Sequence, residues 1–190
     1  LNIYSPPDMT RWRKWIDNLR HPAKEITVAM CGKYTKLEDS YASIIESFNH
    51  CAAHLGVRIN LKWVETTDLK DPSFLKDVNG VVVPGGFGSR GTEGKIEVIR
   101  AVRERNVPFL GLCLGLQLAV IEFARNACGL QGANSTEFDP NTPHPVIDIL
   151  PEQRSVVNKG GTMRLGAYPA ILKQGSVVHS LYQSQEVSER

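Results

Sequence analysis

A short apolar run leads directly into a cysteine framed by glycines, and this junction constrains the fold more than any other feature. Residues 107–112 are mostly apolar, and Gly111-Leu112-Cys113-Leu114-Gly115 passes at once into a helical pattern over 114–127. A strand that turns sharply into a helix at G-x-C-x-G is the cysteine version of the nucleophile elbow. The glycines leave room for neighbouring backbone, and the N–H groups that begin the helix would stabilise a thiolate. The motif therefore predicts a cysteine nucleophile at a sheet edge.

Apolar runs alternate with helical patterns through the first two thirds of the chain. The pattern predicts strands at 26–31, 58–64, 78–83 and 107–112, and helices at 40–55, 93–105 and 114–127. Gly56 is expected to end the first of these helices. The apolar positions of the three helices, in chain order, are Ile44, Ile45, Phe48, Cys51, Ala52 and Leu55, which share one face; Ile96, Ile99 and Val102, which are expected to face the core; and Leu118, Ile121, Phe123 and Ala124. Strands that alternate with helices of this length are typical of βαβ units. We therefore expect an α/β fold: an open, mostly parallel sheet with helices on both faces. The proline-rich last third, from residue 132 onward, predicts loops, a strand or hairpin segment at 162–172 and an antiparallel edge.

The first 24 residues differ in character from the rest of the chain. Residues 9–20 carry Trp12, Trp15, Ile16 and Leu19 at helical spacing, and Pro22 ends the pattern. We expect an interdomain linker with a short amphipathic lead-in helix at 1–24, and one α/β domain at 25–190.

Composition excludes several classes of protein. Lys and Arg number 22 against 20 Asp and Glu, a net charge of +2, which argues against nucleic acid or an anionic membrane surface as partner. The longest apolar stretches are too short to span a bilayer. The four cysteines form no CxxC pair and no metal-ligand spacing with histidine. We therefore expect no metal site, a cytoplasmic location and free thiols, most of them packed as small apolar residues.

A glycine-rich loop provides a second functional signal. Residues 84–91 read Pro-Gly-Gly-Phe-Gly-Ser-Arg-Gly and come directly after the predicted strand 78–83. The loop lacks the Gly-Lys-Ser/Thr of a phosphate-binding P-loop and the spacing of a dinucleotide fingerprint. Acyl transfer needs a second oxyanion donor from a neighbouring strand's loop, and this loop is suited to supply it.

The elbow and the loop together resemble the corresponding motifs of class I glutamine amidotransferases. Three further stretches, 91–95, 133–140 and 160–166, narrow the resemblance to the glutaminase domain of the CTP synthase family. The resemblance extends over nearly the whole chain. It implies a flavodoxin-like three-layer fold and hydrolysis of L-glutamine to glutamate and ammonia, which a synthetase domain of the same polypeptide would use to aminate UTP to CTP.

The resemblance also assigns roles to residues. Cys113 matches the nucleophile that forms a thioester with glutamine, and Gly86 and Leu114 match the oxyanion donors. Glu137 matches the acid that holds the α-amino group of the substrate, a role in which a carboxylate meets a cation. The implied glutamine pocket consists of Gly86, Leu114, Gly115, Leu116, Gln117 and Glu137.

The family's allosteric activator, GTP, is implied to meet the loop that carries Phe87, Arg90 and Glu93. An aromatic ring suits base stacking, and an arginine suits phosphate or ribose. The resemblance implies no cofactor in this domain, ATP and magnesium in the synthetase domain, and a homo-oligomer for the full-length enzyme.

The chain departs from the family pattern in one respect. A cysteine nucleophile needs a histidine base oriented by a carboxylate, and none of the five histidines stands at the family's position. We expect this pair in residues beyond Arg190, since a domain ending there would expose a sheet edge; an intact mass matching 190 residues would contradict this.

Two alternatives for the function stay open: another cysteine hydrolase of the same fold, such as a γ-glutamyl hydrolase or peptidase, and a non-catalytic fragment.

Overall fold

A computed structural model describes residues 7–33, 38–67, 69, 71–154 and 166–189. The chain divides into two compact units, Leu1–Asp148 and Ile149–Arg190, and each is described by itself.

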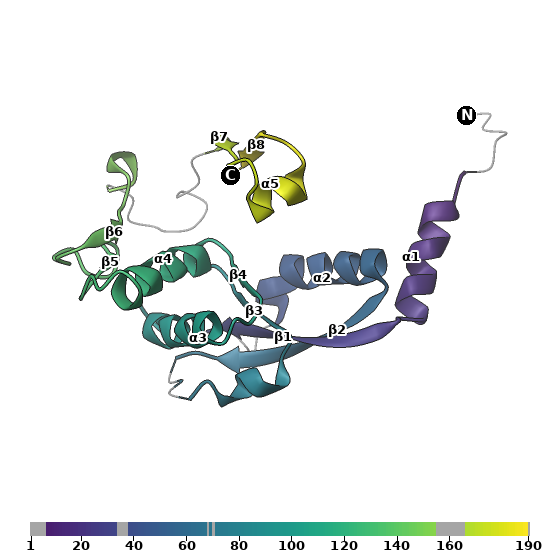
Figure 1. The fold of residues 1–190 in the computed structure, drawn as a ribbon, viewed down its shortest axis with the longest axis horizontal. Helices are drawn as coiled ribbons and strands as arrows, with labels where there is room; N and C mark the ends of the chain where they lie inside the picture. Colours follow the sequence, from purple (N-terminus) through teal and green to yellow (C-terminus); the bar gives the residue numbers. More distant parts are fainter. Residues whose placement is uncertain (1–6, 34–37, 68, 70, 155–165, 190) are drawn as a thin grey trace. The chain divides into compact units, whose positions relative to one another are not determined.

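A four-stranded sheet forms the centre of the first unit (Figure 1). All its strand pairs are parallel, and the order is β2-β1-β3-β4. Its members are β1 (Lys24–Gly32), β2 (Val57–Glu65), β3 (Gly80–Val83) and β4 (Phe109–Gly111). The strands agree with the apolar runs that predicted them, within a few residues at the ends. Because parallel strands share their carboxyl ends, the segments after β1, β3 and β4 meet at one edge.

Helices cover both faces of this sheet. The first face packs against α2 (Ala42–Leu55), and the opposite face against α3 (Thr92–Glu104) and α4 (Leu114–Asn126). Successive residues of β1 alternate between the two cores: Val28 and Met30 pack toward α2, while Ala29 and Cys31 pack toward the other side. The predicted α/β class with helices on both faces is confirmed.

Helix α3 matches its predicted pattern closely. The three residues expected to face the core, Ile96, Ile99 and Val102, are at most 4% exposed. The end of α2 agrees with its sequence signal as well, because Gly56 adopts φ 65° and its N–H bonds the Ala52 carbonyl oxygen.

Some predicted inward positions are wrong. Leu55 and Cys51 of α2 are exposed, whereas Ala52 is buried as expected. Ala53, which was not expected to face the core, is also buried because α1 (Thr10–Arg20) packs on this part of α2, with Asn18 Nδ2 donating to the Ala53 carbonyl oxygen at 2.7 Å. Phe123 of α4 is also exposed, at 52%.

The cysteines differ from expectation in a similar way. Of the four, only Cys31 is buried, and the other three are exposed. The expectation that most of the thiols pack as small apolar residues is therefore wrong.

Helix α1 forms where the sequence predicts it. Its apolar positions Trp12, Ile16 and Leu19 are between 45% and 56% exposed, and Arg11 lies over the Trp15 ring at 4.4 Å. The assignment of residues 1–24 to an interdomain linker stays a prediction.

Two-residue β5 (Asn134–Ser135) pairs in parallel with β6 (Pro145–Ile147) at the end of the first unit. The second unit contains an antiparallel pair, β7 (Tyr168–Ile171) and β8 (Glu186–Glu189), joined through α5 (Val177–Tyr182). Helix α5 was not predicted, because its two leading valines favour a strand; the signal for it is Ser176, whose Oγ accepts from the His179 N–H at 3.1 Å. Short 3₁₀ turns cover Glu38–Tyr41, Ser73–Asp77 and Pro151–Gln153.

The family motif at 160–166 lies outside the described residues except for Gly166. Within the described ranges, every helix is too short or too polar to cross a bilayer.

Candidate functional site

The turn between β4 and α4 has the geometry of a nucleophile elbow. Strand β4 ends at Gly111 and α4 begins at Leu114. Cys113, directly before the helix, adopts φ 52° and ψ −107°, which is rare for a residue with a side chain. Backbone strain of this kind persists where the surrounding structure enforces it, often at functional sites. The strained turn leaves the Cys113 side chain exposed at the carboxyl edge of the sheet.

The two glycines of the motif allow the turn to pack. A Cβ atom on Gly115 would lie 2.1 Å from the Val83 carbonyl oxygen, and one on Gly111 would lie 2.6 Å from the Gly115 carbonyl carbon. No side chain fits at either distance, so helix α4 can approach β3 only with glycine there. The Leu112 N–H donates to the Val83 carbonyl oxygen at 3.0 Å and fixes the turn against β3.

The glycine-rich loop after β3 lies beside the elbow. A Cβ atom on Gly85 would be 3.2 Å from Cys113 Cβ and 3.8 Å from its sulfur. At Gly86, the corresponding atom would lie 3.9 Å from Leu114 Cδ2. The structure thus brings together Gly86 and Leu114, the two predicted oxyanion donors. The Leu114 N–H is the first of helix α4, and the geometry of a helix leaves its first N–H groups without intrahelical acceptors.

Glu137, which is distant from the glycine-rich loop in the sequence, contacts this loop in the folded chain. The Gly88 N–H donates to Glu137 Oε1 at 3.3 Å. Nearby bonds hold the segment: the Glu137 N–H donates to Ser135 Oγ at 3.2 Å, and the Thr136 N–H donates to the Ile147 carbonyl oxygen at 3.0 Å. The half-buried carboxylate is therefore fixed next to the predicted oxyanion loop.

The remaining predicted pocket residues occupy the first turn of α4. Gly115 is buried, Leu116 is 59% exposed, and Gln117 is half-buried with its N–H donating to the Cys113 carbonyl oxygen at 3.2 Å. All of them lie within one helical turn of the cysteine.

Two of the three residues predicted for GTP lie together, and the third has another partner. Lys33, directly after β1, donates through Nζ to the Phe87 carbonyl oxygen, and Arg90 Nη2 donates to the Lys33 carbonyl oxygen at 3.4 Å. Glu93 instead pairs with Arg125 of α4. Sequence reasoning missed Lys33 and Arg125. The position of Lys33 directly after a buried strand could have indicated it, but no local motif points to Arg125.

A buried cation lies close to the sheet. Lys95 of α3 is 1% exposed. Burial, with a smaller contribution from the charge of Lys33, lowers the pKa of Lys95 to about 8. Burial also raises the pKa of the neighbouring Cys31 thiol to about 12, although the charge of Lys95 acts in the opposite direction. Cys31 is therefore held as an unreactive thiol.

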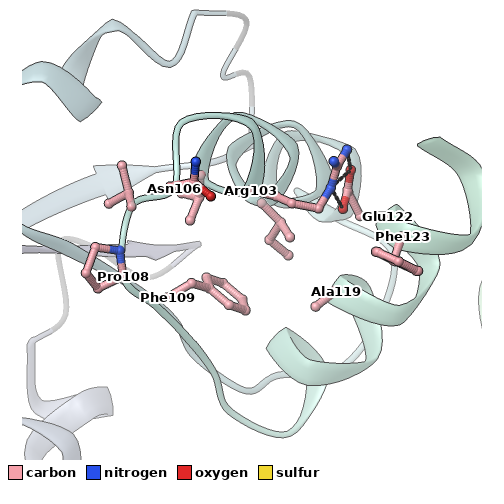
Figure 2. A pocket seen from close by; sticks show the side chains of 10 residues that line it. Arg103, Asn106, Pro108, Phe109, Ala119, Glu122 and Phe123 are labelled. Carbon is pink, nitrogen blue, oxygen red and sulfur yellow. Dashed lines mark hydrogen bonds and ion pairs between the residues drawn. The ribbon is translucent and has the colours of Figure 1, made fainter. Parts of the chain in front are cut away.

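An apolar cavity of about 480 Å³ lies between α3, the start of β4 and α4 (Figure 2). At its rim, Arg103 donates three hydrogen bonds of 2.8 to 3.2 Å to the carboxylate of Glu122, which is 1% exposed. Val107 and Pro108 of the lining precede β4, whereas Cys113 comes after it. This cavity therefore belongs to the amino end of β4 and is separate from the elbow.

The described residues contain no histidine that hydrogen-bonds to the Cys113 thiol. Across the same ranges, no group of three or more His, Cys, Asp or Glu residues could hold a metal ion.

Comparisons with known proteins agree with this geometry. The family model for class I glutamine amidotransferases matches residues 36–190. The chain is 50% identical to a CTP synthase from Methanocaldococcus jannaschii, over 97% of this chain and 36% of that protein. It is likewise 50% identical to the CTP synthase of Thermus thermophilus, over 97% of this chain and 34% of that protein.

A solved structure is similar as well. The glutaminase domain of the Trypanosoma brucei CTP synthase, with bound acivicin, superposes with a TM-score of 0.78 at 35% identity, covering 87% of this chain and 65% of that one. The chain thus spans about a third of the length of the curated relatives it matches.

Proposed function

Since this chain belongs to the class I glutamine amidotransferase family and matches the glutaminase domain of CTP synthases within it, we propose that it hydrolyses L-glutamine to glutamate and ammonia. The observation that carries the proposal is the strained elbow at Cys113, packed against the glycine loop through Gly85. An exposed cysteine at the start of a helix, beside a glycine-rich loop, is arranged for acyl transfer.

The chemistry begins at the cysteine sulfur. The Cys113 thiolate attacks the carbon of the glutamine carboxamide, and the carbonyl oxygen becomes an oxyanion. The backbone N–H groups of Gly86 and Leu114 are suited to stabilise this oxyanion because Gly86 lies close to Leu114, the residue that follows Cys113. Collapse of the tetrahedral species breaks the C–N bond, and ammonia leaves once protonated. Water then hydrolyses the thioester to glutamate and frees the thiol. The family's histidine–glutamate pair would move these protons.

The rest of the site would select the substrate. The carboxylate of Glu137, held by the Gly88 N–H, would accept the α-amino group of glutamine. The backbone and side chains of Leu114 to Gln117 would form the wall along the carboxamide.

The whole polypeptide would use the ammonia. By analogy with the CTP synthases that this chain matches, a synthetase domain would aminate UTP to CTP with ATP and magnesium. We propose no cofactor within this domain, and GTP as an effector at Phe87 and Arg90. Glu93 would meet GTP while paired with Arg125, because its side chain is exposed and its carboxylate can accept further hydrogen bonds. We further propose a homo-oligomeric, cytoplasmic enzyme, since exposed free thiols suit a reducing compartment.

Product analysis tests the proposal. The polypeptide that carries this chain is incubated with L-glutamine or with short peptides, and glutamate, ammonia and peptide fragments are measured. We expect equal amounts of glutamate and ammonia, no peptide cleavage, and complete loss of activity in Cys113→Ala. The variant Cys51→Ala, which changes an exposed thiol on α2, is the matched control and should retain activity. Peptide cleavage would favour another hydrolase of this fold; no product at all would favour a non-catalytic module.

A further inference from the structure

Arg125, in the last turn of α4, joins the start of α3, which is distant from it in the chain, to the segment that follows α4. Its Nη1 donates to both carboxylate oxygens of Glu93, at 3.1 and 2.9 Å, and its Nε donates to the Ala133 carbonyl oxygen at 2.6 Å. The Arg125 side chain is only 19% exposed. A planar guanidinium can serve two acceptors in fixed directions, which an ammonium group cannot do in the same way.

The first partner of Arg125, Glu93, is connected to the glycine-rich loop after β3. Glu93 lies in the first turn of α3, next to Thr92. The Thr92 hydroxyl donates to the Ser89 carbonyl oxygen at 2.7 Å, so the start of α3 is bonded to the end of the loop. Fixing Glu93 therefore fixes the loop that contains Gly86 and Gly88.

The second partner of Arg125, Ala133, belongs to the segment that carries Glu137, the carboxylate of the predicted substrate pocket. Ala133 is fully buried and begins the segment that reaches Glu137 four residues later. The Gly88 N–H then bonds Glu137 and completes a closed ring of contacts. In this ring the Arg125 side chain ties the two segments to helix α4.

The chain offers a contrast in the other arginine–glutamate pair between these helices. Arg103 of α3 binds Glu122 of α4 with similar distances, but at the rim of the apolar cavity, at the amino end of β4. That pair holds the helices together without contacting either segment of the site. The connection to both segments distinguishes Arg125.

We propose that Arg125 is a positioning residue for glutamine binding, which fixes the Glu137 carboxylate relative to the oxyanion loop. This inference rests on the proposed function, because it takes Glu137 as the acceptor for the substrate's α-amino group. Loss of Arg125 would remove one of the bonds that fix the Glu137 segment and so loosen it, while leaving the elbow, built by β4, α4 and the two glycines, intact. Binding of an amino acid would then weaken, and the intrinsic reactivity of Cys113 would not change.

Two reagents separate these effects. An electrophilic glutamine analogue needs the pocket, whereas iodoacetamide needs only the thiol. Second-order rate constants for modification of Cys113 are measured by peptide mapping in the full polypeptide and in Arg125→Met and Arg125→Lys. Arg100→Met, which removes an exposed pair with Glu104 on α3, is the matched control.

For Arg125→Met we expect the rate constant for the analogue to fall at least about tenfold, and the rate constant for iodoacetamide to stay within about twofold of the wild-type value. Arg125→Lys should recover part of the loss, Arg100→Met should behave as wild type, and the KM for glutamine should rise more than kcat falls. Equal slowing with both reagents would show general disruption of the site, and no slowing with either would show that Arg125 is dispensable; both overturn the inference. If wild type itself shows no preference for the analogue, the proposed function fails, and the inference with it.

Discussion

Two cysteines stand near the carboxyl ends of strands in the same sheet, and they illustrate opposite environments. Cys31 is the penultimate residue of β1, fully buried, with its pKa raised to about 12 by burial. Cys113 comes directly after Gly111 and Leu112 at the end of β4, is exposed, and adopts φ 52°. The difference lies in the backbone. Cys31 continues a regular strand, whose alternation directs its side chain into the core, whereas Cys113 leaves the ladder at a strained turn.

The neighbours of the two residues reinforce the difference. Cys31 lies beside Lys95, a cation that is itself buried. Cys113 lies against Gly85 and stands directly before helix α4. A cysteine near the end of a strand is therefore not necessarily a nucleophile. The strained turn and the glycines around it determine whether its thiol is exposed to substrate.

The largest expected contrast is in thiol reactivity. In the native protein at neutral pH, iodoacetamide should modify Cys113 at least about 1,000-fold faster than Cys31, because Cys31 becomes accessible only when the core opens. Time-resolved peptide mapping measures both rates in one sample. Cys51 and Cys128, which are exposed outside the elbow, serve as internal controls and should react more slowly than Cys113. Comparable rates for Cys31 and Cys113 would remove the basis of the comparison.

The second contrast concerns the glycine that permits the elbow. Gly115→Ala places a Cβ atom against the Val83 carbonyl oxygen, so we expect the free energy of unfolding to fall by about 3 kcal/mol, even though alanine favours helix. Gly129→Ala, at φ 70° with open space around it, should cost only about 1 kcal/mol. Denaturant titrations of the two variants give both values. A Gly115→Ala variant as stable as wild type would mean that the approach of α4 to β3 is not tight.

The smallest effect concerns the surroundings of Cys31. The pKa of Lys95 is lowered to about 8 in the folded chain against an ordinary 10.5, so above pH 8 the unfolded chain binds more protons and stability rises with pH. From about pH 8 the raised pKa of Cys31 works in the opposite direction, because the unfolded chain begins to lose a thiol proton, at an ordinary pKa of 9.0, that the folded chain keeps. Lys33 and Glu65 are the other charged groups that act on Lys95.

Between pH 7 and 9 the contribution of Lys95 is the larger of the two. There the free energy of unfolding should rise by about 1 kcal/mol in wild type, and Lys95→Met should remove the rise and be more stable at pH 7. Urea titrations at several pH values measure this. If the free energy of unfolding of wild type did not change over this pH range, the Lys95 ammonium would be hydrated in the folded chain.

The sequence predicted the parts of the fold that local pattern determines. The strands and helices up to α4 agree with apolar periodicity, and the elbow agrees with two glycines around a cysteine. Exposure of Leu55, Cys51 and Phe123 was not predictable, because it depends on which neighbouring helix covers each face. Helix α5 was missed because its six residues carry too little periodic signal.

The residues of the candidate site also fall into those that the sequence could predict and those that it could not. Gly86, Cys113 and Leu114 lie in local motifs that could be located from the sequence. Arg125 could not be found, because its partners Glu93 and Ala133 become neighbours only in the folded chain.

Covalent labelling with an electrophilic glutamine analogue tests most directly whether Cys113 is a glutamine-directed nucleophile. Wild type, Cys113→Ala and Cys31→Ala are labelled, and intact mass and peptide mapping are the readouts. We expect one adduct per chain, located on Cys113, suppressed by excess L-glutamine, absent from Cys113→Ala and unchanged in Cys31→Ala. An adduct spread over Cys51 and Cys128, or one that glutamine does not suppress, would contradict a glutamine-directed nucleophile at the elbow.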